Sequence, residues 1–264
     1  MKTRRLARVG LVVVASLAFV ATGCGTAAEE PGTISPSWVT SHDENAKKDL
    51  LASVEHVKTT SFKATAKTSG NATIEVRIDP TAKTGTKRIV VTVPQTSSSI
   101  VAELVVTGGK SYAKVEFNDI PQAPNLPTGW MQLDLAKLEK PENYTLEEPD
   151  PANLAAVFKG LRTVQRDGDG AFTGTVDLTK VTRSAMVDSD VVEELGDKAT
   201  AVPFEATVDD QGRITSLRLL VPAHGSNPAE TLEVTYTDWG APVTVDKPAR
   251  TVRPNAAAYE FFNA

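Results

Sequence analysis

Hydrophobic and polar residues alternate along most of this chain, and a few stretches show helical periodicity instead. The first such stretch is 43–58, in which Ala46, Leu50 and Val54 recur at helical spacing with charged residues on the opposite side. This pattern predicts an amphipathic helix. Asp43 is a suitable N-cap, because an aspartate side chain accepts hydrogen bonds from the amides of the first turn.

After this helix the period changes from about 3.6 to 2, which is typical of antiparallel strands with one covered and one wet face. Turn-forming residues such as Gly108-Gly109 and 209–212 separate the alternating runs and favour hairpins. Two more helices are predicted, at 150–164 and 191–199. The alternating runs occupy 61–69, 71–79, 87–93, 100–106, 110–117, 129–135, 171–178, 202–221 and 231–240.

This order of elements predicts an α+β fold. We expect one large curved antiparallel sheet, a half-barrel of about nine to eleven strands, with helices on its concave face. The inward positions are mostly small or aliphatic, which suits an acyl chain, because such a ligand requires only apolar area and shape. An ordinary packed core explains the same pattern, and patterning alone favours it. The candidate cavity-wall residues are Leu50, Val54, Phe62, Ala64, Ala66, Ile74, Val76, Ile89, Val91, Leu104, Leu154, Val157, Phe172, Phe204, Val234 and Tyr236.

The N-terminus has the composition of an export signal. A basic cluster is followed by an apolar run at 9–20 and by small residues that lead to Cys24, the only cysteine of the chain. The apolar run is about 12 residues long, too short for a membrane span of about 20. The stretch Ala21-Thr22-Gly23-Cys24 resembles a bacterial lipobox, although the commonest lipobox has leucine in the place of Ala21.

The resemblance to a lipobox implies a modification of Cys24. The thiol would receive a diacylglyceryl group, and cleavage would leave the cysteine as the first mature residue. Two or more acyl chains hold a protein stably on a membrane. A free thiol or an intermolecular disulfide remains the alternative role for this residue.

Four regions follow from these patterns. We expect a removed signal peptide at 1–23, a lipid-anchored flexible tether at 24–42, a folded domain at 43–249 and a loose C-terminal tail at 250–264. The tether contains Pro31 and Pro36 and few apolar residues, and the tail is rich in proline and alanine.

Composition argues against several functions. The net charge is −5, and it becomes more negative once the basic leader is removed, which argues against a nucleic-acid partner. The three histidines, His42, His56 and His224, lack metal-ligand spacing, and we expect them at the surface. There is no GxSxG motif, and Cys24 is assigned to the anchor. We therefore expect no enzyme, metal or cofactor; an enzyme assembled from scattered carboxylates remains an open alternative.

The order of several short segments resembles the LprG/LppX family of actinobacterial lipoproteins, whose fold is akin to LolA/LolB-type lipoprotein carriers. The similarity covers residues 46–249. It implies a half-barrel with helices over the concave side and an apolar cavity for di- or triacylated lipids. The matching segments are the lipobox ending at Cys24, LLASVEHVKTTSFKATAKT, IDPTAKTGTKRIVVTV, LVVTGGKSYAKV, GWMQLD, PFEATVDDQGRITSLRL and LEVTYTDWGAPVTVDKPA.

These observations together predict a monomeric lipoprotein of the cell envelope, anchored through Cys24 on the extracytoplasmic face of the cell membrane. It would bind an acylated lipid or lipoglycan in an apolar cavity, and carry or present it without catalysis. The alternative is a regulatory or structural envelope lipoprotein of the same fold with a packed interior, which acts through a protein partner.

Overall fold

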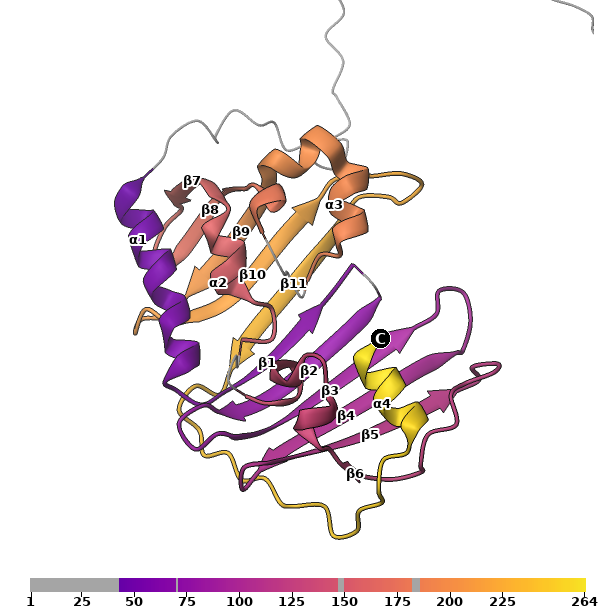
Figure 1. The fold of residues 1–264 in the computed structure, drawn as a ribbon. Helices are drawn as coiled ribbons and strands as arrows, with labels where there is room; N and C mark the ends of the chain where they lie inside the picture. The colour runs from indigo at the N-terminus through magenta and orange to yellow at the C-terminus, as the bar shows by residue number, and fades with distance from the viewer. Residues whose placement is uncertain (1–42, 70, 147–149, 182–185) are drawn as a thin grey trace, which may run out of the picture. The chain divides into compact units, whose positions relative to one another are not determined.

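The computed structural model describes residues 43–69, 71–146, 150–181 and 186–264. Their strands form one antiparallel sheet of eleven strands that does not close, which confirms the predicted α+β fold (Figure 1). The strands are β1 (Phe62–Lys67), β2 (Ala72–Asp79), β3 (Thr84–Thr92), β4 (Ser99–Thr107), β5 (Lys110–Asn118), β6 (Met131–Gln132), β7 (Leu161–Arg166), β8 (Ala171–Val176), β9 (Val202–Val208), β10 (Ile214–Val221) and β11 (Glu230–Thr237). The α-helices of the described residues are α1 (Glu44–Ser53), α2 (Leu154–Lys159), α3 (Ser189–Leu195) and α4 (Ala256–Asn263).

Two series of hairpins make up this sheet. The strand order is β6-β5-β4-β3-β2-β1-β11-β10-β9-β8-β7, so strands that are adjacent in sequence pair within each series. Pairing between β1 and β11 joins the two series, with Ala64 opposite Tyr236 and Ala66 opposite Val234. This long-range pairing extends one apolar face across all the central strands, because paired residues of antiparallel strands share a face.

One face of the sheet carries the hydrophobic core, and we call it the inner face. Leu50 of α1, Leu154 of α2 and Phe262 of α4 belong to the same buried cluster as Phe62 of β1 and Phe204 of β9. In Figure 1 these helices lie on one side of the sheet, and α3 lies near the ends of β10 and β11. We call the opposite face, on which the charged residues of the central strands lie, the outer face.

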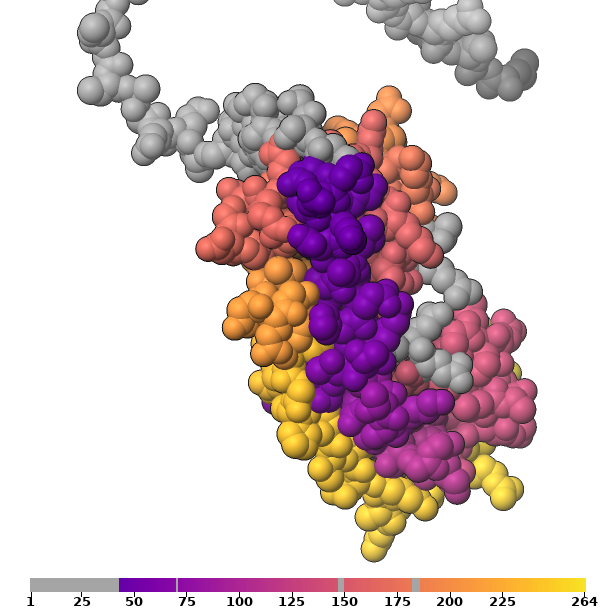
Figure 2. Space-filling model, turned by 90° about the vertical axis from the view of Figure 1, so that its left-hand side faces the viewer, coloured from indigo at the N-terminus to yellow at the C-terminus, as the bar shows by residue number. Residues whose placement is uncertain are grey.

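The first helix begins where the sequence predicts. The Asp43 side chain accepts hydrogen bonds from the backbone N–H groups of Asn45 and Ala46, at 2.9 and 3.1 Å. The helix runs along one edge of the domain (Figure 2), against β7. There Asp49 forms an ion pair of 2.5 Å with Arg166. A 3₁₀ turn, Val54–Lys58, completes the predicted stretch 43–58.

The second predicted helix is shorter than its sequence pattern. Only Leu154–Lys159 is helical, and residues from Leu161 onward form β7. Gly160 makes this change possible, because its carbonyl accepts a hydrogen bond from the N–H of Asp177 at 2.8 Å. A Cβ at this position would lie 2.5 Å from the Asp177 carbonyl oxygen, so only glycine permits this approach.

The prediction of a loose tail at 250–264 is wrong for residues 256–263, which form α4. The Asn255 side chain caps this helix by accepting a hydrogen bond from the N–H of Ala258 at 2.8 Å. Ala258 and Phe262 are buried in the core, and the ring of Phe261 packs edge-on against Phe117 at 5.6 Å between centroids. Apolar side chains on one face therefore outweigh the coil-like composition of the tail.

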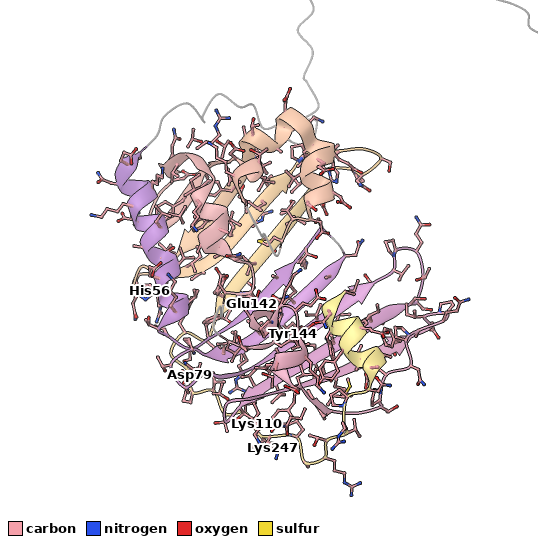
Figure 3. All side chains as sticks on the ribbon, viewed as in Figure 1. His56, Asp79, Lys110, Glu142, Tyr144 and Lys247 are labelled. Carbon is pink, nitrogen blue, oxygen red and sulfur yellow. The ribbon has the colours of Figure 1, made fainter. Side chains whose placement is uncertain are left out.

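The prediction that the histidines lie at the surface is wrong for His224, which is 5% exposed. Its backbone exchanges hydrogen bonds with Asn227, and its Nδ1 lies 3.1 Å from the carbonyl oxygen of Pro222. This tight loop encloses the ring, which the loop-like sequence alone does not reveal. His56 is partly exposed at the end of the first helical stretch, and His42 lies outside the described residues (Figure 3).

Candidate functional site

The chain after β6 returns over the inner face of the sheet. The carbonyl oxygen of Tyr144 accepts a hydrogen bond from Ser111 Oγ on β5 at 2.6 Å, and Figure 3 shows Tyr144 in front of the sheet. Further along, the Asp150 carboxylate accepts a hydrogen bond from the Tyr236 hydroxyl on β11 at 2.9 Å. We call Tyr144–Leu146 and Asp150 the crossing segment, because these residues contact strands on both sides of β1.

Leu146 places the crossing segment over β3. Its Cδ1 atom would lie 3.1 Å from a Cβ built on Gly85, and Gly85 is paired with Ile78 of β2 and Val106 of β4. The inner face is fully covered at this level, since Ile78 and Val106 are buried. The crossing segment therefore closes one end of the inner face of β2–β4.

Beyond the crossing segment, part of the inner face of β3–β5 is only half-buried. We call this group of apolar side chains the inner-face patch, and it consists of Ile89, Val91, Ile100, Ala102 and Phe117. They form a continuous surface, because Ile89 is opposite Ala102, Val91 is opposite Ile100, and Ile100 is opposite Phe117. In Figure 1, β2 and β3 lie between α2 and α4, and α4 borders the patch where Phe261 contacts Phe117.

One cation shares the face of this patch. Lys87 is opposite Val76 of β2 and Leu104 of β4, both of which are buried, so its side chain lies on the inner face. The residue is half-buried, and burial lowers the pKa of its ammonium group because the charged form loses hydration. Among the described residues, no acceptor forms a hydrogen bond or an ion pair with its Nζ.

Lys87 is absent from the site residues predicted above, although the sequence contains the signal. The alternation in β3 places residues of one parity on the inner face, and Lys87 precedes the inward-facing Ile89 by two positions. A lysine in the inward register of an apolar strand is a departure from the pattern. Such a departure can point to a functional residue.

The predicted cavity-wall residues come together on the inner face. All of them except Ile89 and Val91 are buried, and all except Val91 belong to the core cluster or pack against it. At the β1–β11 junction, for example, the ring of Phe62 lies 5.5 Å from Tyr236 and 5.2 Å from Trp239. These rings fill space as core residues do. Of the predicted residues, therefore, only Ile89 and Val91 lie where a ligand could contact them without displacing the core. Cys24 lies outside the described residues.

A polar pair, of which Tyr236 is buried and Asp150 is half-buried, joins the crossing segment to the sheet. Burial raises the pKa of Asp150, and hydrogen bonds from Tyr236, Ala152 and Leu154 oppose this shift. Burial and the charge of Asp150 raise the pKa of Tyr236 well above its usual value. Because Asp150 also accepts hydrogen bonds at the start of α2, the pair fixes this helix above β11. Within the described ranges, no three His, Cys, Asp or Glu residues gather as metal ligands.

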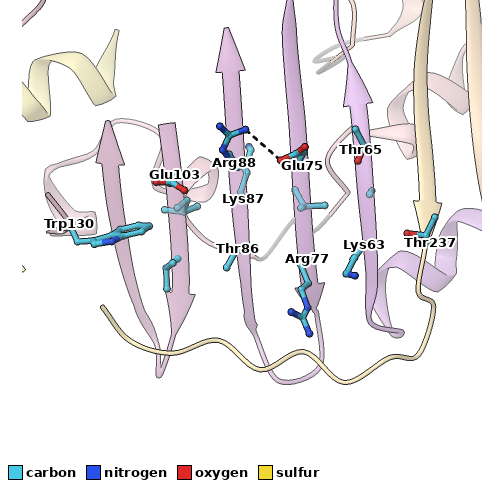
Figure 4. Close-up of a pocket in the computed structure, with 14 residues that line it drawn as sticks. Lys63, Thr65, Glu75, Arg77, Thr86, Lys87, Arg88, Glu103, Trp130 and Thr237 are labelled. Atoms are coloured by element: carbon cyan, nitrogen blue, oxygen red, sulfur yellow. Dashed lines mark ion pairs between the residues drawn. The ribbon is translucent and has the colours of Figure 1, made fainter. Parts of the chain in front are cut away.

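The outer face has a groove of about 510 Å³ across β11 and β1–β4, with Trp130 at one end (Figure 4). Several charged side chains here are paired, as in the 3.6 Å contact between Arg88 and Glu75. Lys87 also borders the groove, but its position opposite Val76 and Leu104 directs its side chain to the inner face, so it contributes only its backbone.

A C-terminal strap, residues 239–253, follows this groove. The carbonyl of Pro242 accepts a hydrogen bond from Arg77 at 3.1 Å, and the N–H of Val252 donates to the carbonyl of Trp130 at 2.8 Å. Figure 4 shows the strap passing the ends of the strands below the groove. The groove is thus a polar surface, which differs in chemistry from the inner-face patch.

No model of a known protein family matches the chain, and no curated protein is significantly similar to it. None of the helices in the described ranges is long and apolar enough to cross a membrane. Function is therefore inferred from the chemistry of the two faces of the sheet.

Proposed function

We propose that the chain is a lipoprotein of the cell envelope, anchored through an acylated Cys24, that binds the acyl chain of a lipid on the inner face of its sheet. It carries or presents this lipid or lipoglycan and performs no chemistry on it. The proposal extends the resemblance to the LprG/LppX family and the resemblance of Ala21-Thr22-Gly23-Cys24 to a lipobox.

The half-buried inner-face patch is the observation that carries this proposal. Its side chains are aliphatic or aromatic, adjacent to one another and accessible in part. Each methylene that moves from water onto such a surface contributes about 0.8 kcal/mol. About ten methylenes would then contribute about 8 kcal/mol, which offsets the lower range of association costs, about 4 kcal/mol.

The outer groove is a less suitable place for an acyl chain. Glu75, Arg88 and Glu103 line it, and each forms an ion pair on the outer face. A hydrocarbon chain in this groove would displace water from these charges without replacing the lost hydrogen bonds. We therefore assign the acyl chain to the inner face.

The burial of most predicted wall residues favours a second candidate function. A side chain such as Phe204 or Val234, which is 1% or less exposed, already has its full set of packing partners. If the patch simply completes this core, the protein would act through a partner in the envelope, as a regulatory or structural lipoprotein.

Native mass spectrometry separates the two candidates. The chain starting at Gly25 lacks the anchor but keeps the whole core, whose residues lie between Ala46 and Phe262. When this form is exported by an actinobacterial host behind a cleavable signal peptide without a lipobox, and purified without detergent, we expect additional masses that correspond to a bound lipid. A variant with Ile89→Asp should lose these masses, whereas Thr86→Asp on the outer face should keep them. A lipid-free wild-type protein across gentle conditions would favour the packed interior.

A further inference from the structure

Lys87 differs in its surroundings from the lysines that form ion pairs. Three lysines form ion pairs with carboxylates: Lys63 with Asp238 at 2.5 Å, Lys114 with Glu103 at 3.3 Å, and Lys58 with Glu55 at 2.7 Å. The side chains of these three lysines are all partly exposed to solvent. Lys87 instead lies between buried aliphatic side chains, and no described residue supplies an anion or another acceptor. An ammonium group has three hydrogen-bond donors. Placing it among apolar side chains costs free energy unless these donors find acceptors.

In β3, Lys87 lies between the residue that the crossing segment covers and the first residue of the inner-face patch. Two residues before it in β3 is Gly85, which the crossing segment covers through Leu146. Two residues after it is Ile89, the first residue of the inner-face patch, and Val91 follows on the same face. Lys87 therefore lies where the closed end of the inner face meets the half-buried apolar surface. The distance from Lys87 to Val91 along the strand is about 13 Å, at about 3.3 Å per residue.

We propose that Lys87 binds the anionic head group of an amphiphile whose acyl chain lies over the inner-face patch. This inference rests on the proposed function and adds the class of ligand, an acyl chain that ends in a carboxylate or a phosphate. The head group lies against the crossing segment, and the chain runs over Ile89 and Val91 toward Ile100. Hydrogen bonds between an ammonium group and an anionic oxygen are about twice as strong as neutral ones, so the lysine selects for charge.

The alternative role for this residue is purely structural. The aliphatic stem of a lysine can cover apolar surface while its ammonium group reaches water. In that case the charge contributes nothing to ligand selection, and a side chain of similar length without charge would serve equally well. Methionine meets this description, so Lys87→Met distinguishes the two roles.

Titration calorimetry with three probes of equal chain length tests the inference. The probes are dodecanoate, dodecyl phosphate and dodecan-1-ol, each added at pH 7.4 to the chain that starts at Gly25. We expect the wild type to bind at least one of the two anions about tenfold more tightly than the alcohol. Lys87→Met should remove this preference and leave the affinity for the alcohol within about twofold of the wild type. Lys87→Arg should retain most of the preference.

Lys67→Met is the matched control, because Lys67 is an exposed lysine of β1 that shares the face of Lys63 rather than that of the core. It should bind all three probes as the wild type does. Binding of the alcohol and the anions with equal affinity, unchanged in Lys87→Met, would overturn the role of Lys87 and leave acyl binding intact. If none of the probes binds, both this inference and the proposed lipid binding fail. A preference for only one anion identifies the head group as carboxylate or phosphate.

Discussion

Removal of the Tyr236 hydroxyl tests how the crossing segment is held on the sheet. In Tyr236→Phe the ring keeps its contacts with Phe62 and Trp239, which lie 5.5 and 5.8 Å from it between centroids. Only the hydrogen bond of 2.9 Å to Asp150 is lost. A hydrogen bond to a charged group contributes about 1.5–3 kcal/mol, and a neutral one about 0.5–1.5 kcal/mol. We therefore expect a loss of about 2 kcal/mol in the free energy of unfolding where Asp150 is ionised.

The loss should depend on pH, and its sign follows from the pKa of Asp150. Burial raises this pKa in the folded protein above its value in the unfolded chain. The free energy of unfolding is therefore higher at low pH, where the carboxyl is protonated, and falls as the pH rises through the folded pKa. The hydrogen bond from Tyr236 opposes that shift. Without it the folded pKa rises further, so the loss of unfolding free energy in the variant is smaller where Asp150 is protonated and larger where it is ionised.

Urea unfolding at a series of pH values from 4 to 8, followed by tryptophan fluorescence, measures this difference. We expect a loss of about 2 kcal/mol at pH 8, which corresponds to a fall of about 4–8 °C in Tm, and a loss that decreases toward about 1 kcal/mol as Asp150 becomes protonated at the acidic end of the series. The matched control is Tyr144→Phe, because the Tyr144 hydroxyl donates to the neutral carbonyl of Phe262 at 2.8 Å. Its loss should be the same at every pH of the series. A loss for Tyr236→Phe that is also constant over the whole series would refute the role assigned to Asp150.

Three further predictions concern the core, the sheet and the anchor. Leu50→Ala should cost about 2–5 kcal/mol of unfolding free energy in urea, whereas Leu51→Ala should cost less than about 1 kcal/mol, because the first side chain is fully buried and the second is 38% exposed. Gly174→Ala should cost about 2–3 kcal/mol in the same assay, because the added Cβ would overlap the backbone carbonyl of Thr163; an unchanged stability would contradict this packing. Cys24→Ser should move the protein from the membrane pellet to the soluble fraction after alkaline washing, and continued pelleting would contradict the lipid anchor.

Much of the local structure could be predicted from the sequence. Alternating residues such as Phe62, Ala64 and Ala66 do lie on one face, and the predicted N-cap Asp43 begins α1. These features depend on neighbours in sequence, so the pattern of the chain contains them. The predictions failed where a residue from a distant segment decides the outcome. α4 is helical where a coil was expected, because its apolar face packs on β5 and the core.

The candidate site shows the same limit. Periodicity identified Ile89 and Val91 as inward-facing, but their half-burial depends on which segments cover β3, and no local pattern specifies this. Lys87 could have been assigned to the inner face from its register with Ile89. Its lack of a partner among the described residues could not, because that requires the positions of the charged groups near it. Most predicted wall residues prove to be core residues for the same reason, since local alternation cannot separate a filled interior from an open one.

The sequence by itself determined the class of fold, most of the hairpins and which residues of most strands face inward, because strand alternation and turn chemistry act over a few residues; β7 is the exception, since its residues were predicted to be helical. It also determined the resemblance of the N-terminus to a lipobox. Only the tertiary structure decided that β1 pairs with β11, that Asp150 meets Tyr236, and that the apolar surface beside Lys87 is left half-buried. The physical reason is that burial and pairing depend on contacts between residues far apart in the chain, whereas periodicity reports only on neighbours.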